Sequence, residues 1–250
     1  MSEDIIRNNE SVNNEDNNDT NKETNDKFMD FSRIDEEHEG ELRKKLTPKE
    51  RFFRVCEKFG DLFLLNVLFA LTSLPIVTIG ASFTAMYTIT LKMVNNEDAP
   101  VRKSYFEAFK KNFRQATQLW VMVLIVLALM YKQFQMVLGS TSGASDFMVL
   151  LLGLEMLVVS FILPLLFPMV ARYENGNLNM IKNSLIASFL NIGTWATVYF
   201  LWMIPVIVYY LKPMLFAYTW YLWLMFLAAF VAYTCSYRLR KMFAKIEERG

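Results

Sequence analysis

The chain has 250 residues, of which 54% are hydrophobic and 15% aromatic, a content that excludes an ordinary soluble globular domain. Its net charge of +1 hides an asymmetry, because residues 1–45 hold 14 acidic and 7 basic side chains whereas the remainder holds 11 acidic and 19 basic. An acidic segment therefore precedes a basic, strongly apolar body. This pattern indicates an integral membrane protein and gives no sign of a nucleic-acid partner.

Residues 1–45 are rich in Asn, Asp and Glu, and we expect them to form a disordered cytoplasmic tail, because so few apolar side chains cannot offset the cost of ordering the backbone. Residues 46–250 are expected to form the helical membrane domain. We expect no secretory signal, since the first long apolar run begins only near Phe59. Seven basic residues between Arg43 and Lys58 are typical of a juxtamembrane anchor on an anionic leaflet.

The first apolar run, residues 61–94, has 34 residues, which is too long for one ordinary span and barely enough for two. Pro75 and Gly80 interrupt it near the middle, and proline removes a helical hydrogen bond and clashes with the preceding turn. The run is therefore predicted to be a helical hairpin that turns at residues 74–80. A single span is the alternative.

Four later runs are long enough to cross the hydrocarbon core of a bilayer, which takes about 20 helical residues. They are residues 116–137, 147–170, 192–211 and 214–235. With a hairpin in the first run the total is six spans, and nearly all Lys and Arg side chains then lie on one side, as expected for the cytoplasmic face. With a single span the total is five, and the basic cluster before Asp61 would have to be translocated. We favour an all-α, multi-pass bundle of about six spans in the cell membrane, with both termini in the cytoplasm.

Two segments between spans are predicted to be amphipathic helices on the cytoplasmic surface, residues 104–116 and 177–191. The first begins with Ser104 and Glu107 spaced as a capping box. Its apolar stripe includes Phe109 and Phe113, and Lys110 and Lys111 lie opposite. These four residues are candidates for docking, either on the lipid bilayer or in the groove of a membrane partner.

Several motifs resemble the signature of the YesL-like family of bacterial membrane proteins. They comprise the run from Asp61 to Tyr87, a Phe-Glu-Ala-Phe-Lys stretch at 106–110, and Phe-Pro with Ala-Arg-Tyr at 167–173. The residues that carry the resemblance are Asp61, Asn66, Pro75, Thr78, Gly80, Ser82, Thr84, Tyr87, Pro168 and Arg172. The resemblance covers about residues 50–240. It implies a bacterial membrane protein of unknown activity, from a family whose genes often lie near those of carbohydrate uptake systems, including sugar ABC transporters.

The sequence offers no constellation that carries catalysis, and we expect neither enzymatic activity nor a cofactor. The only histidine, His38, lies in the acidic tail, so neither a zinc site nor a Ser and His arrangement can be assembled. No Gly-rich, lysine-containing phosphate loop is present. The two cysteines, Cys56 and Cys235, would both lie near the reducing cytoplasm, where a disulfide is not expected.

Glu155 is the only acidic side chain deep within an apolar run, and burying a charge at the bilayer centre costs about 2.5–3.5 kcal/mol. Lys132 lies at a comparable expected depth on the preceding span. An ion pair between Glu155 and Lys132 is the simplest hypothesis. A role in substrate or proton passage, or a neutral Glu155 without a role, are the alternatives.

The first hairpin also carries an unusual number of hydroxyl groups and small residues. Gly80 and Thr84 are spaced to let two helices approach closely, and packing is favoured over a polar transport pathway. We therefore expect a non-enzymatic accessory or regulatory component that acts with a membrane partner, such as a sugar ABC transporter. An independent secondary transporter or channel is the alternative.

Overall fold

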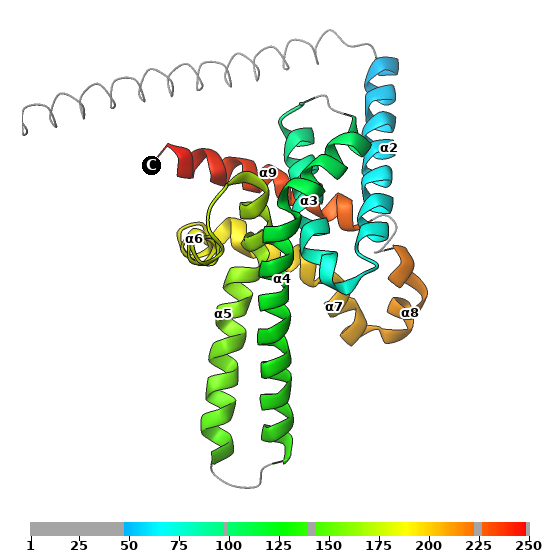
Figure 1. Ribbon diagram of the computed structural model, residues 1–250. Coiled ribbons are helices and arrows are strands. Elements are labelled where there is room, and N and C mark those ends of the chain that lie inside the picture. Colours follow the sequence, from blue (N-terminus) through cyan, green and yellow to red (C-terminus); the bar gives the residue numbers. More distant parts are fainter. Residues whose placement is uncertain (1–47, 98–99, 140–143, 223–226, 249–250) are drawn as a thin grey trace, which may run out of the picture. The chain divides into compact units, whose positions relative to one another are not determined.

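The computed structural model describes residues 48–97, 100–139, 144–222 and 227–248, which are helical and contain no strand (Figure 1). The helices are α2 (Pro48–Thr72), the short 3-10 helix η1 (Ile76–Thr78), α3 (Ile79–Val94), α4 (Val101–Gly139), α5 (Ala144–Arg172), α6 (Asn177–Leu190), α7 (Ile192–Leu211), α8 (Pro213–Leu222) and α9 (Ala228–Glu247). The predicted all-α fold is thereby confirmed. The chain divides into two units, residues 1–58 with 248–250, and residues 59–247. The packing described below is that of the second unit, and the predicted acidic tail lies outside the described residues.

The first apolar run is broken where the proline predicts. Helix α2 ends at Thr72, and α3 begins at Ile79 after the turn of η1. Pro75 precedes η1 in an extended conformation (φ −75°, ψ 117°), as its ring requires. Gly80 does not contribute to the break, because it lies in the first turn of α3 and is buried.

Helix α4 is a single helix of 39 residues, which corrects the prediction of a separate surface helix at residues 104–116. No Gly or Pro separates that segment from the following apolar run, so the helical hydrogen bonding continues while the composition changes. The predicted capping box is also wrong. The helix begins at Val101, three residues before Ser104, and the Ser104 amide donates to the Pro100 carbonyl (3.0 Å).

The helices from α5 to α7 follow the sequence pattern closely. Helix α5 contains the predicted run 147–170, and its internal Pro164 and Pro168 do not end it. Helices α6 and α7 match the predicted segments 177–191 and 192–211 to within a residue. The Asn191 carbonyl accepts hydrogen bonds from the amides of Thr194 and Trp195, which begins α7 directly after α6.

The predicted last span, residues 214–235, falls on α8 and on the first part of α9, and its continuity stays a prediction. Helix α8 has 10 residues and α9 has 20, and residues 223–226 between them lie outside the described part of the chain. Helix α9 continues well past Cys235 to Glu247, into the basic C-terminal segment.

Four of the described helical segments are long and apolar enough to cross a membrane: Ile76–Val94, Val101–Gly139, Asp146–Arg172 and Ile192–Leu211. In each of them we compared how much of the most apolar 18-residue stretch is buried within the chain. The buried share is 56% for Ile76–Val94, and it is 6%, 17% and 6% for the other three in chain order. Helix α3 is thus the centre of the core, and it packs against α4, α5 and α9. The other three present most of their apolar side chains outward.

Candidate functional site

The Pro75 turn is held by hydroxyl groups of the motif residues. Thr78 Oγ1 donates to the carbonyl oxygens of Thr72 (2.6 Å) and Pro75 (2.8 Å), which closes the turn. Ser82 Oγ donates to Thr72 Oγ1 (2.9 Å), and the Tyr105 hydroxyl lies 2.6 Å from the same oxygen. Because Tyr105 is on α4, this network joins α2, α3 and α4 through hydroxyl groups that include those of the motif residues Thr78 and Ser82.

Gly80 is the point at which α3, α4 and α5 approach most closely. A Cβ atom there would lie 2.6 Å from Trp120 Cβ, 2.7 Å from the Ala116 carbonyl oxygen and 3.0 Å from Phe167 Cε1. Neighbouring Trp120 donates its indole N–H to the Ile76 carbonyl (2.7 Å), which fixes the turn against α4. The predicted close packing at Gly80 therefore has a direct geometric basis, since only glycine leaves room for this contact.

Asn66 and Tyr87 connect the first hairpin to the C-terminal helices. The fully buried Asn66 accepts a hydrogen bond from the backbone amide of Ala229 (2.9 Å), in the first turn of α9. The Tyr87 hydroxyl accepts the indole N–H of Trp202 on α7 (2.7 Å). Each of these motif residues supplies an acceptor to a donor from a distant part of the sequence.

Two further motif residues of the first hairpin are Thr84 and Asp61. Thr84 is fully buried and donates to the carbonyl of Gly80 (3.0 Å) within its own helix. Asp61 is half-buried on α2. Both lie on the faces that pack the hairpin, and neither is brought together with Lys132 or Glu155.

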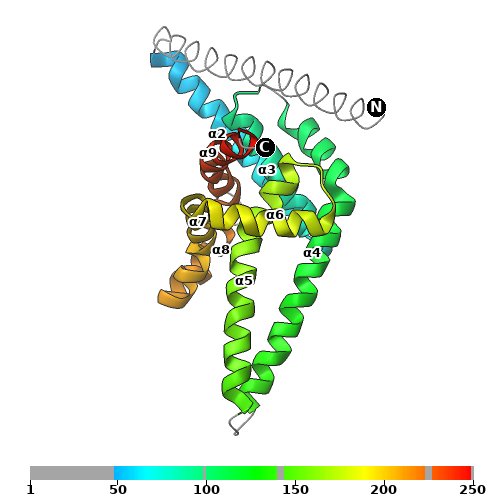
Figure 2. The same cartoon turned by 90° about the vertical axis from the view of Figure 1, so that its left-hand side faces the viewer.

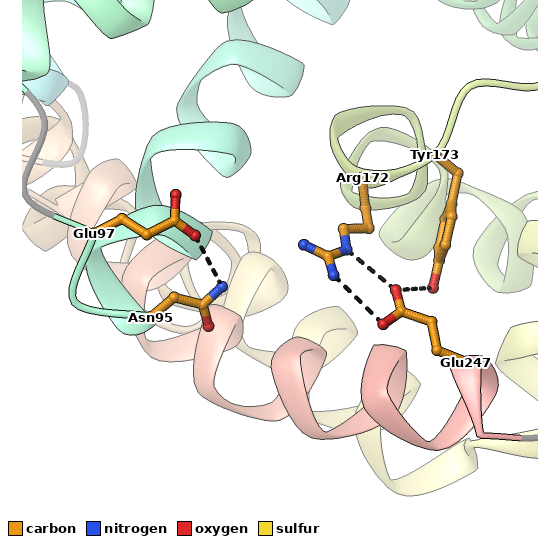
Figure 3. A network of polar contacts seen from close by, with 5 residues as sticks. All are labelled: Asn95, Glu97, Arg172, Tyr173 and Glu247. Atoms are coloured by element: carbon orange, nitrogen blue, oxygen red, sulfur yellow. Dashed lines mark hydrogen bonds and ion pairs between the residues drawn. The ribbon is translucent and has the colours of Figure 1, made fainter. Parts of the chain in front are cut away.

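The second motif region closes the end of α5 onto α9 (Figure 3). Arg172 Nε and Nη2 donate to the two carboxylate oxygens of Glu247 (3.2 and 3.4 Å), and the Tyr173 hydroxyl donates to Glu247 Oε1 (3.2 Å). Burial, followed by the nearby Glu247 charge, raises the pKa of Tyr173, so its hydroxyl remains a donor at all ordinary pH values. Pro168 lies one turn earlier in α5, beside Phe167 in the core.

Three residues on one face of α4 bond to the linker between α5 and α6. Lys111 Nζ lies 2.5 Å from Glu174 Oε1, Gln115 donates to the Asn175 carbonyl, and Gln118 accepts from Asn177 Nδ2 (2.9 Å). The three α4 residues follow the spacing of a single helical stripe. The Lys111 ammonium lowers the pKa of the Glu174 carboxyl through a hydrogen bond and its charge. Because both side chains are exposed, this pair orients the linker more than it stabilises the fold.

The candidate docking residues are divided between the interior and the surface. Phe109 is half-buried and stacks on Tyr105, whereas Phe113 is 40% exposed. Lys110 is exposed, and Lys111 is occupied by Glu174. The chain itself therefore covers part of the stripe that was predicted to dock on a partner.

Lys132 and Glu155 are not brought together, and they form no ion pair within the described residues. Gln133 on α4 donates to the Met148 carbonyl on α5 (3.3 Å), which sets the antiparallel register of the two helices. In this register Glu155 lies about six residues, or roughly 9 Å, further from the hairpin loop than the level of Lys132. Lys132 is exposed, and Glu155 is half-buried on the stripe of α5 that includes the buried Leu152.

This arrangement predicts an additive double-mutant cycle for the two residues. The changes Lys132→Met and Glu155→Gln should alter the free energy of unfolding independently. The change in free energy of the double variant should equal the sum of the two single changes to within about 0.5 kcal/mol. The measurement is thermal unfolding of the four proteins in one detergent. A coupling free energy of about 2 kcal/mol or more would contradict this prediction and support the ion pair suggested by the sequence.

Sequence reasoning missed the partners Trp120, Trp202 and Tyr105. Their hydrogen bonds join residues separated by 44, 115 and 33 positions, so no local pattern reveals them. Only the chemistry of these side chains could have indicated that they have partners. A buried Trp or Tyr needs a partner for its polar atom, and the hydroxyl-rich first hairpin offers several.

Comparisons with known proteins agree with the sequence motifs only in part. A protein family described as "Protein of unknown function, DUF624" matches residues 62–134, which include the motif residues from Asn66 to Tyr87 and most of α4. No curated protein and no solved structure matches the chain. Within the described residues, no three His, Cys, Asp or Glu side chains gather as metal ligands would. The comparisons thus support an uncharacterised domain family for this part of the chain.

Proposed function

We propose that this protein is a non-enzymatic component of the cell membrane that acts as an accessory or regulatory subunit of a larger membrane assembly, with both termini in the cytoplasm. The observation that carries the proposal is the small share of α4, α5 and α7 that is buried within the chain, 6%, 17% and 6% of their most apolar windows. Such helices need lipid or another membrane protein around them.

Polar side chains on these outward surfaces favour a protein partner over lipid alone. Lys132 and Gln135 are exposed on α4, within the part of the helix that packs only against α5. A charged group facing hydrocarbon is costly, so intramembrane polar residues usually face other helices or reach the headgroups. A second membrane protein against this face would supply a partner for the Lys132 ammonium, whereas Gln135 donates to the Tyr131 hydroxyl of its own helix (2.9 Å).

The resemblance to the YesL-like family suggests the biological setting. Members of that family are encoded near carbohydrate uptake systems, and the present chain shares with them the motif residues that build the Pro75 turn. A sugar ABC transporter is accordingly the kind of partner that we propose. Bacterial origin rests on the same resemblance.

The alternative of an independent transporter needs hydroxyl groups free to line a pathway. In the described hairpin the hydroxyl groups are already engaged in hydrogen bonds. Those of Thr72, Thr78 and Ser82 bond to one another or to carbonyl groups of the turn. Among the described residues, Lys132 and Glu155 form no ion pair with each other. These arrangements favour the accessory component.

Copurification under mild detergent tests the proposal. We expect a membrane partner to copurify with the unmodified protein, and Phe113→Ala to reduce its yield more than Lys110→Gln does, because the aromatic ring supplies shape as well as apolar area. Phe109→Ala is unsuitable as the probe, since Phe109 also packs inside this chain.

Matched controls separate docking from folding. Lys111→Gln removes only an exposed ion pair and should leave both the yield and the unfolding midpoint unchanged. If no membrane protein copurifies, or if Phe113→Ala leaves the partner's yield unaltered, the proposal of an accessory subunit is wrong. The alternative of an independent transporter is then favoured.

A further inference from the structure

Helix α6 lies across the α4–α5 hairpin and is tied to it at both ends (Figure 2). At its beginning, Asn177 donates to Gln118 on α4 (2.9 Å), and near its end Ser188 Oγ donates to the Phe161 carbonyl on α5 (2.6 Å). The ring of Phe189 stacks on Phe161 with centroids 4.6 Å apart. The axis of α6 is therefore fixed nearly perpendicular to both long helices.

The two attachment points lie at one level along the hairpin. The contact between Gln133 and the Met148 carbonyl sets the register, and thirteen residues further from the loop on each helix stand Trp120 and Phe161. Trp195, at the start of α7, stacks on Phe161 and donates to the neighbouring Ser160 carbonyl (2.9 Å). We call this level, defined by Trp120, Phe161, Trp195 and α6, the tryptophan belt.

On one side of the tryptophan belt the α4–α5 hairpin extends furthest, beyond α7 and α8 (Figures 1 and 2). From Trp120 to Gly139 there are 19 residues, or about 28 Å of helix, close to the thickness of a bilayer's hydrocarbon core. Exposed apolar residues surround this part of the hairpin: Val121, Ile125, Leu129, Met136, Phe147, Leu150, Leu154 and Leu157.

On the other side of the belt, exposed basic residues accumulate along the first half of α4, at Lys103, Lys110 and Arg114. Helix α3 also extends to this side from the Pro75 turn, because Trp120 holds Ile76 at the belt while α3 packs along the first half of α4. The turn presents three exposed apolar side chains at that level, Leu74 (77% exposed), Ile76 (65%) and Val77 (50%).

We propose that the tryptophan belt marks the cytoplasmic boundary of the bilayer, and that α6 and the Pro75 turn form a lipid-binding surface in that boundary. This inference rests on the membrane location in the proposed function. Leu178, Ile186, Phe189 and Leu190 are exposed on α6 and enter the headgroup and acyl boundary, while the exposed Lys182 meets anionic headgroups.

The consequence is a revised topology for the first apolar run. Helix α3 then lies on the cytoplasmic side as the core of a helical domain, which agrees with its 56% buried window, and the Pro75 turn dips into the inner leaflet without reaching the outer face. The six-span hypothesis places that turn outside. The two topologies therefore predict opposite locations for Val77.

Cysteine labelling separates them. In a background with Cys56→Ala and Cys235→Ala, Val77→Cys should not react with an impermeant maleimide applied to intact cells. Thr141→Cys, in the loop that the sequence places outside, is the positive control, and Lys110→Cys should react only in inverted vesicles. Labelling of Val77→Cys from outside would overturn the proposal and restore six spans.

A spin label measures depth in the same variants, reconstituted in nanodiscs that contain this chain alone with phosphatidylcholine and phosphatidylglycerol. Labels at Val77 and Phe189 should be shallow, with oxygen accessibility well above that of Lys103→Cys, and Ile125→Cys should be the deepest. A deep label at Val77 would contradict the boundary. A fully aqueous label at Phe189 would show that the α6 face awaits a protein, and would overturn its assignment to lipid.

Labelling and depth do not depend on any copurified protein. If the accessory function fails while Val77 remains shallow and inaccessible from outside, the lipid-binding surface stands. If Val77 proves to be outside while a partner still copurifies, the proposed function stands without this surface.

Discussion

Replacing Gly80 by alanine is expected to lower the thermal unfolding midpoint by several degrees, although alanine is the better helix former. The added Cβ would meet Trp120 Cβ at 2.6 Å and the Ala116 carbonyl oxygen at 2.7 Å. Neither atom is the flexible end of a side chain, so α3 and α4 must separate. Overpacking of this kind costs about 3 kcal/mol at its upper range, against about 1 kcal/mol gained in helix propensity.

The control is Gly153→Ala in α5, where a Cβ would meet nothing within 4 Å. That change should leave the midpoint unchanged or raise it. The measurement is fluorescence-monitored thermal unfolding in detergent. Equal midpoints for Gly80→Ala and the unmodified protein would mean that the helices are less closely packed at the Pro75 turn than the structure indicates.

Loss of the Asn66 side chain should have a comparable effect through a different mechanism. Asn66→Ala leaves the buried Ala229 amide without its acceptor and opens a small cavity, for a combined cost of about 3 kcal/mol. Because that amide belongs to the first turn of α9, hydrogen exchange should accelerate most at residues 229–232. Asn66 thereby caps a helix that lies more than 160 residues further along the chain.

Asn112→Ala provides the matched control. The Asn112 side chain donates to the Ala108 carbonyl within its own helix (3.2 Å) and is only half-buried, so its removal should change stability by less than about 0.5 kcal/mol. Similar losses for the two variants, or unchanged exchange at the start of α9, would contradict a capping role for Asn66.

The sequence predicted the elements whose ends carry a chemical signal. Pro75 stops α2, and residues 177–191 and 192–211 were delimited because Asn191, Lys212 and Pro213 interrupt the apolar pattern. The close approach at Gly80 was also predictable, since small residues at helical spacing leave room for a neighbouring backbone.

Other features could not be predicted from local patterns. A change from polar to apolar composition at Ala116 was taken as a helix boundary, yet composition alters a helix's environment without ending it. The pairing of Lys132 with Glu155 depended on counting depth from assumed span ends. The register set by Gln133 places Glu155 about six residues, or roughly 9 Å, from the level of Lys132.

The hydrogen-bond partners within the candidate site were the least accessible to sequence reasoning. Asn66, Tyr87 and Ser82 were identified as motif residues, but their roles as acceptors or donors depend on helices distant in sequence. The sequence thus indicated which residues matter, and only the three-dimensional packing showed what each of them holds.

Because α4 is one unbroken helix, a movement at one of its ends is transmitted to the other end, as in a lever. Its first half is held at Gly80 and Tyr105, whereas the half beyond Trp120 runs beside α5 toward the far end of the hairpin over about 28 Å (Figure 2). A tilt of about 5° at Gly80 would move the far end by roughly 2.5 Å, because an unbroken helix bends little over that length. Any force that a neighbouring protein applies to α4 near Gly139 would reach the N-terminal end of the same helix as torque about Gly80.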